Sequence, residues 1–287
     1  MQIPGQPKHL PALDGLRGVA ILLVILTHAS EGWTAAAATV RDTSGAKSTF
    51  VLPHWLEVVS GGAAHGVTLF FLVSAFTLTL SVSGRPLDWR QFAVRRIARV
   101  GPGYWLAGLG YTIVAGASAR LWAPHGVGPS DVVVAALFGS AWLGGPSIAV
   151  VPGRWSVSVE MTFYLLLPVL TLAIGGRLWR ALALAAITLI VAQLRARHEI
   201  AIGAWSFFDY CNPLSQAPVF LLGVVAAMVV RRFDLPRLPG AAPAALLIAV
   251  FVIPFSPVKE WHLLSHVQFA LVAVLAVTLS AVQPPVS

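Results

Sequence analysis

Two ionisable side chains lie inside apolar stretches where a charge is costly. His28 closes the run VAILLVILTH, and Glu160 lies in WSVSVEMTFYLLLP. A neutral imidazole can accept a proton near pH 7, as a general base must. A carboxylate in an apolar setting needs a partner or takes up a proton, and Tyr164 lies four residues further on the same helical face. If His28 and Glu160 meet, the carboxylate would orient the ring and stabilise the imidazolium.

Both residues also have a purely structural interpretation. His28 could be a structural histidine bonded to a backbone carbonyl, and Glu160 could serve an interhelical hydrogen bond. Ionisable residues inside membrane segments are rare and usually face the interior of the helix bundle. The sequence therefore makes both residues functional candidates without excluding the structural roles.

The densest cationic stretch is DWRQFAVRRIARVGPGYW, which carries Arg90, Arg95, Arg96 and Arg99. On a helix, Arg99 shares a face with Arg95 and with Arg96. Two guanidinium groups on one face suit bidentate binding of phosphate. The alternative is a patch that sets membrane topology or binds anionic lipid. Pro102 is expected to mark the beginning of the next membrane span.

Polar residues also occur in the first two apolar runs. In DGLRG, before the first run, Asp14 is predicted to be a helix N-cap and Arg17 to lie at the cytoplasmic interface. The second run, GVTLFFLVSAFTLTL, is apolar except for Ser74 and several threonines. Taken alone, that run indicates a buried helix with small residues for packing.

The composition decides the class of protein that must position these residues. Of 287 residues, 57% are hydrophobic and only 10% are charged, with a mean hydropathy of +0.80. Soluble chains carry about 25% charged residues, so a soluble enzyme is excluded, as are a disordered chain and a fibrous repeat. The net charge of +8 fits basic cytoplasmic loops better than binding to nucleic acid. Trp89, Trp105 and Trp155 fit aromatic belts at the membrane surfaces.

Runs long enough to cross a bilayer predict an all-α, polytopic transmembrane helix bundle of about 8–10 spans. We expect one integral-membrane domain over residues 1–287. The weaker run 131–143 is too short to span comfortably, and the positive-inside rule favours a re-entrant or interfacial helix with a cytoplasmic N-terminus. The spans are expected at 18–33, 62–83, 100–118, 155–174, 181–194, 213–230, 240–255 and 262–282.

Five sequence blocks occur in an order that points to one family. They are LPALDGLRGVAILLVILTH, HGVTLFFLVSAFTLTL, FAVRRIARVGPGYW, WSVSVEMTFYLLLPVL and APVFLLGVVAA. Together they resemble the acyltransferase 3 family of integral-membrane acyltransferases, over about residues 10–227. The resemblance implies transfer of an acyl group, most often acetyl, from a coenzyme A thioester to a hydroxyl of a carbohydrate or glycoconjugate. It also implies a multi-pass protein of the bacterial inner membrane.

The resemblance assigns roles to particular residues. The family's first-span histidine falls on His28, which is expected to be catalytic together with Glu160. The implied acyl-CoA-binding residues are Arg17, Arg96 and Arg99, and the implied substrate-binding residues are Asp14, Ser74, Trp155, Ser156 and Tyr164. Acyl-CoA is the expected co-substrate, and no resident cofactor, metal or nucleic-acid partner is expected.

Two departures from the family pattern leave other functions open. The usual Ser-Gly-Phe reads Ser74-Ala75-Phe76 here, and alanine lacks the backbone freedom of glycine. The chain also ends soon after the last run, so one or two spans are expected to be missing. A catalytically inactive homologue is one alternative. The other is a transporter or flippase of a lipid-linked glycan, with His28 and Glu160 as a proton relay, although we find none of the internal repeats typical of transporters.

Overall fold

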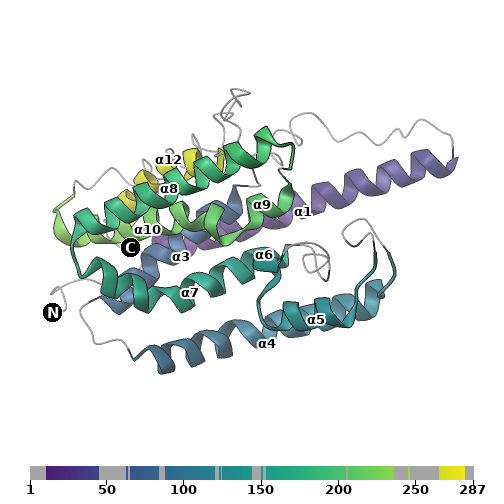
Figure 1. Ribbon diagram of the computed structural model, residues 1–287, viewed down its shortest axis with the longest axis horizontal. Coiled ribbons are helices and arrows are strands. Elements are labelled where there is room, and N and C mark those ends of the chain that lie inside the picture. The colour runs from purple at the N-terminus through teal and green to yellow at the C-terminus, as the bar shows by residue number, and fades with distance from the viewer. Residues whose placement is uncertain are drawn as a thin grey trace. The chain divides into compact units, whose positions relative to one another are not determined.

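The computed structural model describes residues 11–44, 63, 65–83, 88–119, 123, 125–143, 150, 153–204, 206–235, 245 and 265–281. All regular secondary structure in these residues is helical, which confirms the all-α prediction (Figure 1). The chain forms two compact units. The first unit combines Met1–Ser81 with Leu222–Ser287, and the second is Val82–Leu221.

The helices follow the predicted runs closely in some places and extend them in others. The run predicted at 155–174 is α7, and the run at 213–230 is α10, each within two residues. The run predicted at 240–255 lies outside the described residues except for position 245. The helices are α1 Pro11–Ser44, α3 Gly66–Val82, α4 Trp89–Ala115, α5 Pro129–Ala136, α6 Ser140–Leu143, α7 Arg154–Ile174, α8 Leu178–Ala201, α9 Phe207–Cys211, α10 Pro213–Arg232 and α12 Ser265–Ala281.

Four of the described segments are long and apolar enough to cross a membrane: Ala12–Ser30, Arg154–Ile174, Leu178–Ala201 and Phe207–Arg232. At a rise of 1.5 Å per residue, the 21 residues of α7 extend over about 31 Å, which matches a hydrocarbon core of about 30 Å. Large apolar side chains stay exposed along α7 and α8, as they do on lipid-facing helices. They are Leu165, Leu166, Val169, Leu172, Leu182, Ile187, Ile190, Val191 and Leu194.

A tight turn joins α7 to α8. Gly175 and Gly176 have φ values of +56° and +71°, which glycine adopts without steric cost. The Gly175 N–H donates to the Thr171 carbonyl at 3.0 Å and ends α7. Because so short a connection makes antiparallel neighbours, the end of α7 and the beginning of α8 lie at the same end of the helix pair.

Helix α4 corrects the expectation that Pro102 lies at the beginning of a helix. The arginine-rich stretch and the apolar run form one continuous helix, and Pro102 lies inside it. The helix begins where the Asp88 carboxylate accepts the N–H groups of Arg90 and Gln91, at 3.1 and 3.2 Å. This N-cap satisfies free amides at the helix start, and the helix then runs on through the proline.

The weak run forms two short helices, α5 and α6. The eight residues of α5 reach only about 12 Å, which is too short to cross a bilayer and favours a run that does not span. Two side chains of α4 hold α5 in place. The Tyr104 hydroxyl donates to the Ala135 carbonyl, and the Trp105 indole donates to the Ala136 carbonyl, both at 3.0 Å.

Ser158 of α7 secures the turn between α5 and α6. The turn contains Phe138, whose φ of +58° is unusual for a residue other than glycine. The Ser158 hydroxyl donates to the Phe138 carbonyl and accepts the Ala141 N–H at 3.1 Å. The predicted re-entrant run is therefore fixed to α7 through a buried serine.

Within the first unit, glycines allow close packing around α3. A methyl group on Gly66 would lie 2.7 Å from the Ala20 carbonyl oxygen of α1, and one on Gly223 of α10 would lie 2.8 Å from the Ala75 Cβ. Ala75 is fully buried in a regular stretch of α3. The alanine at this position is therefore accommodated by a glycine opposite it, and it needs no glycine-like backbone conformation.

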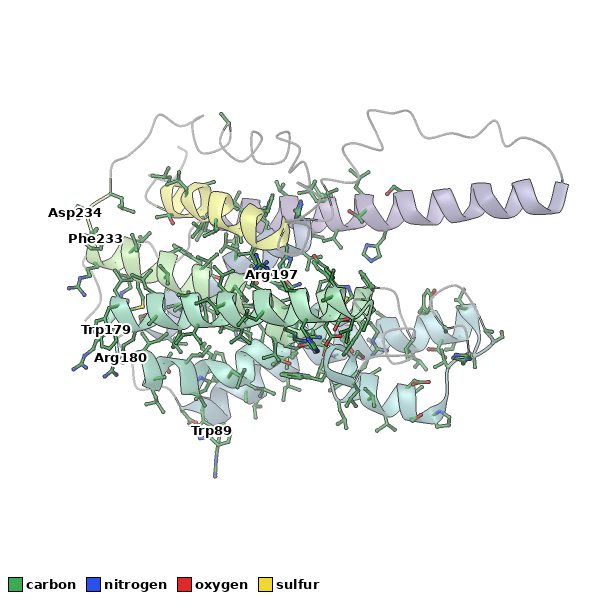
Figure 2. The ribbon with its side chains drawn as sticks, turned by 45° about the horizontal axis from the view of Figure 1, so that its top comes forward. Trp89, Trp179, Arg180, Arg197, Phe233 and Asp234 are labelled. Carbon is green, nitrogen blue, oxygen red and sulfur yellow. The ribbon has the colours of Figure 1, made fainter. Side chains whose placement is uncertain are left out.

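Helices α4 and α8 each carry, in their first turn, a tryptophan followed directly by an arginine. Trp89 and Trp179 are 57% and 64% exposed, and Figure 2 shows both near the starts of their helices. The Arg90 and Arg180 guanidinium groups lie 5.8 and 5.4 Å from the neighbouring indole centroids. Exposed tryptophan beside arginine is typical of a membrane–water interface. Trp155, in contrast, is only 5% exposed, so its assignment to an aromatic belt is wrong.

Candidate active site

His28 lies in α1, in the first unit, and is half-buried. Its Nδ1 atom is 2.9 Å from the Val24 carbonyl oxygen, one helical turn earlier. A carbonyl only accepts hydrogen bonds, so Nδ1 carries the proton and donates it. The other nitrogen, Nε2, therefore keeps a lone pair that can accept a proton. The bond to a backbone carbonyl is the one expected of a structural histidine, and it also fixes the tautomer that a general base needs.

Asp14 and Arg17 lie near the start of the same helix. The prediction that Asp14 is an N-cap is wrong, because α1 already begins at Pro11 and Asp14 lies in its first turn. There its carboxylate is 3.5 Å from Arg17 Nη1, where a negative charge also suits the helix dipole. Arg17 Nη2 donates to the Thr77 hydroxyl of α3. Arg17 thus links α1 to α3 and keeps further N–H donors.

Ser74 lies in the same part of α3 and is buried. The Thr77 hydroxyl is 3.2 Å from the Ser74 carbonyl oxygen and 2.9 Å from that of Val73. Thr77 thus accepts a hydrogen bond from Arg17 while it donates to the backbone of α3. The structure brings Ser74 within one turn of the residue that Arg17 contacts.

In the second unit, Glu160 and Tyr164 of α7 form a buried pair. Their exposed fractions are 6% and 7%. The Tyr164 hydroxyl donates to Glu160 Oε1, as the spacing of four residues predicts. A buried carboxylate requires a hydrogen-bond partner, and tyrosine supplies one without adding a charge.

Arg96 of α4 joins this pair from the neighbouring helix. Its guanidinium carbon lies 5.3 Å from the centroid of the Tyr164 ring and 5.3 Å from that of Phe92. Arg96 thus contacts the Tyr164 ring, and the Tyr164 hydroxyl donates to Glu160. These two contacts connect α4 to the Glu160 carboxylate. The structure thus brings together three of the predicted site residues: Arg96, Tyr164 and Glu160.

Arg99 and Arg95 are exposed on α4, whereas Arg96 is half-buried. The three arginines therefore do not form one uniform surface. Arg96 points to the aromatic rings, and Arg99, one turn further, remains free to meet a charged group at the surface of the unit. A phosphate held by both Arg96 and Arg99 would contact one half-buried and one exposed guanidinium group.

Trp155 and Ser156 lie at the start of α7. The Trp155 ring packs edge-on against Tyr210 and Phe207, with centroid distances of 5.4 and 6.3 Å. The Ser156 hydroxyl donates to the Gly153 carbonyl at 2.9 Å and so stabilises the beginning of the helix. Trp155 connects α7 to α9, and Ser156 is half-buried beside it.

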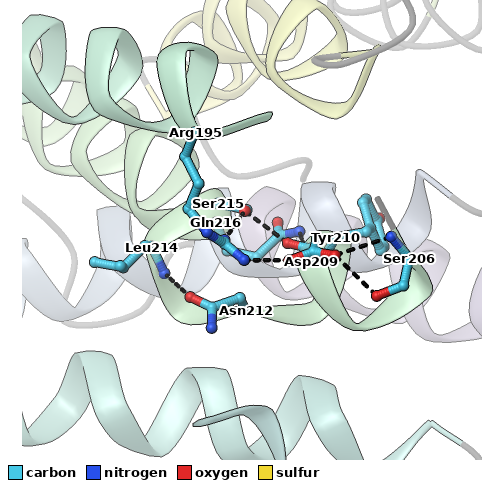
Figure 3. A network of polar contacts seen from close by, with 8 residues as sticks. All are labelled: Arg195, Ser206, Asp209, Tyr210, Asn212, Leu214, Ser215 and Gln216. Carbon is cyan, nitrogen blue, oxygen red and sulfur yellow. Dashed lines mark hydrogen bonds and ion pairs between the residues drawn. The ribbon is translucent and has the colours of Figure 1, made fainter. Parts of the chain in front are cut away.

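Sequence reasoning missed a polar network next to this aromatic cluster (Figure 3). Arg195 of α8 forms an ion pair with Asp209 of α9 and donates to the Ser215 hydroxyl at 3.2 Å. Asp209 also accepts the Ser206 N–H and hydroxyl, at 2.9 and 2.8 Å. Ser206 and Asp209 form a capping box, and their spacing of three residues before an apolar run is a signal that could have revealed it.

The network fixes the segment that supports Trp155. Gln216 donates to the Tyr210 carbonyl at 2.7 Å, and the Leu214 N–H donates to the Asn212 side chain at 3.0 Å. The ends of α8, α9 and α10 are therefore held together by several hydrogen bonds on each side of Tyr210. This arrangement holds the aromatic face against which the first turn of α7 packs.

The candidate residues divide between the two units. His28, Asp14, Arg17 and Ser74 belong to the first unit. The second unit contains the remaining candidates, which are Arg96, Arg99, Trp155, Ser156, Glu160 and Tyr164. The pairing of His28 with Glu160, and of Arg17 with the arginines of α4, stays a prediction.

Helices long and apolar enough to cross a bilayer, with large apolar side chains exposed along them, indicate an integral membrane protein. A family model described as an acyltransferase domain matches residues 10–285, nearly the whole chain. The chain belongs to the acyltransferase 3 family, and the resemblance found in its sequence blocks is confirmed. No curated protein and no solved structure matches it. Membership in this family makes the protein a membrane acyltransferase.

Proposed function

We propose that this protein moves an acyl group, with acetyl as the first candidate, from acyl-CoA to a hydroxyl of a carbohydrate or glycoconjugate. The observation that carries the proposal is the family match over residues 10–285. It covers every residue to which the sequence analysis assigns a role. The particular donor and the particular acceptor are the parts that we propose.

The phosphates of acyl-CoA are assigned to Arg96 and Arg99, with Arg17 as a third group. Arginine holds phosphate through two parallel N–H donors. The exposed side chain of Arg99 supports this assignment, because a charged ligand can reach it from water. The contact of Arg96 with Tyr164 supports it as well, since it links the donor site to the carboxylate of Glu160.

His28 is assigned as the general base, through its Nε2 atom. Nε2 takes the proton of the acceptor hydroxyl while the hydroxyl oxygen attacks the thioester carbonyl. The carbon–sulfur bond then breaks, and the coenzyme A thiolate takes the proton from the imidazolium and leaves as a thiol. The Nδ1–H bond to the Val24 carbonyl supports this role, because it leaves Nε2 unprotonated. Transfer through an acyl-enzyme is the rival route.

Glu160 is assigned to orient His28 and to stabilise the imidazolium. Its carboxylate is buried and accepts from Tyr164 through one oxygen. Because the Nδ1–H of His28 is bonded to the Val24 carbonyl, Glu160 would orient the ring by sharing this Nδ1–H, while Nε2 stays unprotonated. This assignment requires the two units to bring His28 and Glu160 together.

The proposed orientation places the donor and the acceptor on opposite sides of the bacterial inner membrane. Coenzyme A is cytoplasmic, and the Trp–Arg pairs at the starts of α4 and α8 support a cytoplasmic position for those helix ends. Because α7 and α8 are antiparallel, Arg154 and Trp155 would then lie on the outer side. The acceptor would approach from there.

The experiment is thiol release from acetyl-CoA by the purified protein in bilayer nanodiscs, with a panel of glycan acceptors. We expect acceptor-dependent release by the wild type and at least a ~100-fold loss in His28→Ala, because general bases contribute about 10²–10⁴ to rate. His198→Ala is the matched control, since His198 is exposed at the end of α8. Undiminished release by His28→Ala would overturn the base assignment.

A further inference from the structure

Arg154, the first residue of α7, is a buried cation. Its exposed fraction is 7%, and its Nε atom has no hydrogen-bond partner. Buried arginines are normally paired with a carboxylate or with several hydrogen-bond acceptors. This guanidinium instead lies over an aromatic ring, with its Cζ atom 4.1 Å from the Tyr104 centroid.

Helix α4 makes room for the Arg154 guanidinium. A methyl group on Gly108 would lie 3.0 Å from Nη1 and 3.2 Å from both Cζ and Nη2. Tyr104 and Gly108 are one turn apart on α4 and therefore present the ring and the open space on one face. The Tyr104 ring is itself held, through its hydroxyl, by the Ala135 carbonyl. The position of the cation is thus set by its surroundings.

A second polar atom without a partner lies in the adjoining helix. The Ser140 hydroxyl of α6 is fully buried and makes no hydrogen bond. Its neighbour Ala141 donates to Ser158, which lies one turn after Arg154 on the same side of α7. Buried polar groups are rarely left unsatisfied. At the junction of α4, α6 and α7, the Nε–H of Arg154 and the hydroxyl of Ser140 are therefore two buried polar groups without a hydrogen-bond partner.

We propose that Arg154 binds a carboxylate or phosphate group of the acceptor, so that the acceptor is an anionic glycan. A carboxylate or phosphate would supply an acceptor for the unsatisfied Nε–H of the guanidinium. The assignment of this anion to the acceptor rests on the proposed function, which places the start of α7 on the outer side. The binding of an anion at Arg154 does not depend on acyl transfer.

The test measures sugar binding without any acyl donor. The probes are methyl glucoside, methyl glucuronide and methyl glucoside 6-phosphate, which differ only at C6. Affinity is measured by calorimetry with the full chain in phosphatidylcholine nanodiscs. We expect wild type to bind both charged sugars at least ~10-fold more tightly than the neutral one, because charge-assisted hydrogen bonds are the strong ones. Arg154→Gln should lose this preference.

Matched controls separate the site from general charge and folding effects. Arg197→Gln removes an exposed arginine of α8 and should keep the preference (Figure 2). Gly108→Ala should weaken the preference by displacing the guanidinium, whereas Gly110→Ala should not, because nothing lies within 4 Å of a methyl group there. A wild type without the preference, or an Arg154→Gln variant that retains it, would overturn the proposal.

A lipid headgroup is the other source of such an anion. If phosphatidylglycerol in the nanodiscs raises the melting temperature of wild type but not of Arg154→Gln, while the sugars show no preference, the acceptor assignment is overturned. Acetyl-CoA turnover is measured separately. Turnover with neutral acceptors alone would contradict the anionic acceptor and leave the proposed function intact. Binding of charged sugars by a protein without turnover would leave the site intact and contradict the proposed function.

Discussion

Glu160 and Arg154 lie less than two turns apart on α7, and both are more than nine-tenths buried, but their surroundings differ. Glu160 accepts a hydrogen bond from Tyr164, whose ring lies under Arg96. The Arg154 guanidinium lies over the ring of Tyr104, and its Nε atom has no hydrogen-bond partner. Burial of an ion costs several kcal/mol, whereas a desolvated cation–π contact returns about 2 kcal/mol. Glu160 thus has a hydrogen-bond partner within the chain, whereas under the proposal above the Nε–H of Arg154 gains its acceptor only when an anion binds.

Among the groups around Glu160, the largest effect should come from the Tyr164 hydroxyl that donates to it. Tyr164→Phe removes a buried hydrogen bond to a charged group, which is worth about 1.5–3 kcal/mol. We expect kcat for acetyl-CoA turnover to fall by about 10-fold or more. Tyr104→Phe is the matched variant beside Arg154, because it loses a hydroxyl bond to Ala135 but keeps its ring over Arg154.

Tyr104→Phe should lower the melting temperature and leave kcat within about twofold of wild type, since a neutral hydrogen bond contributes about 1 kcal/mol. If both tyrosine variants lose kcat equally, the distinction between the surroundings of Glu160 and those of Arg154 is wrong. If Tyr164→Phe keeps full kcat, the support of Glu160 by Tyr164 has no part in catalysis.

A smaller effect should separate two arginines of α4. Arg96→Gln removes the half-buried cation that contacts the Tyr164 ring. It should raise the KM for acetyl-CoA about 10-fold, because a charge-assisted hydrogen bond to phosphate is lost. Arg99→Gln removes an exposed cation and should raise that KM only a few-fold, with a strong dependence on salt. Arg95→Gln, also exposed, is the control.

Steady-state kinetics at several acetyl-CoA and acceptor concentrations would measure both effects. A rise in the acceptor KM alone, with the acetyl-CoA KM unchanged, would contradict the assignment of these arginines to the donor. If Arg96→Gln and Arg95→Gln raise the KM for acetyl-CoA equally, the contact of Arg96 with Tyr164 has no special role in donor binding.

The sequence predicted the parts of the fold that depend on local pattern. Apolar runs of about 20 residues located α7 and α10, and the spacing of four residues predicted the pairing of Glu160 with Tyr164. The same reasoning misplaced the start of helix α4, because proline commonly begins a helix. The cap at Asp88 and the helical residues before Pro102 outweighed that preference.

The parts that the sequence did not predict depend on contacts between distant residues. The ion pair of Arg195 with Asp209 forms only when α8 and α9 meet. Trp155 was assigned to the lipid interface because tryptophan favours it, yet the aromatic rings of α9 cover it. The burial of Arg154 against Tyr104 and the unsatisfied Nε–H likewise depend on its neighbours on α4, which are distant in the sequence.

The joint action of His28 and Glu160 is the central claim, and a double-mutant cycle tests it most directly. Acceptor-dependent thiol release from acetyl-CoA would be measured for wild type, His28→Ala, Glu160→Gln and the double variant. If the two residues act as one unit, each single variant loses at least about 100-fold, and the double variant is little worse than the poorer single one. Losses that multiply in the double variant, or a His28→Ala variant that retains turnover, would contradict the account.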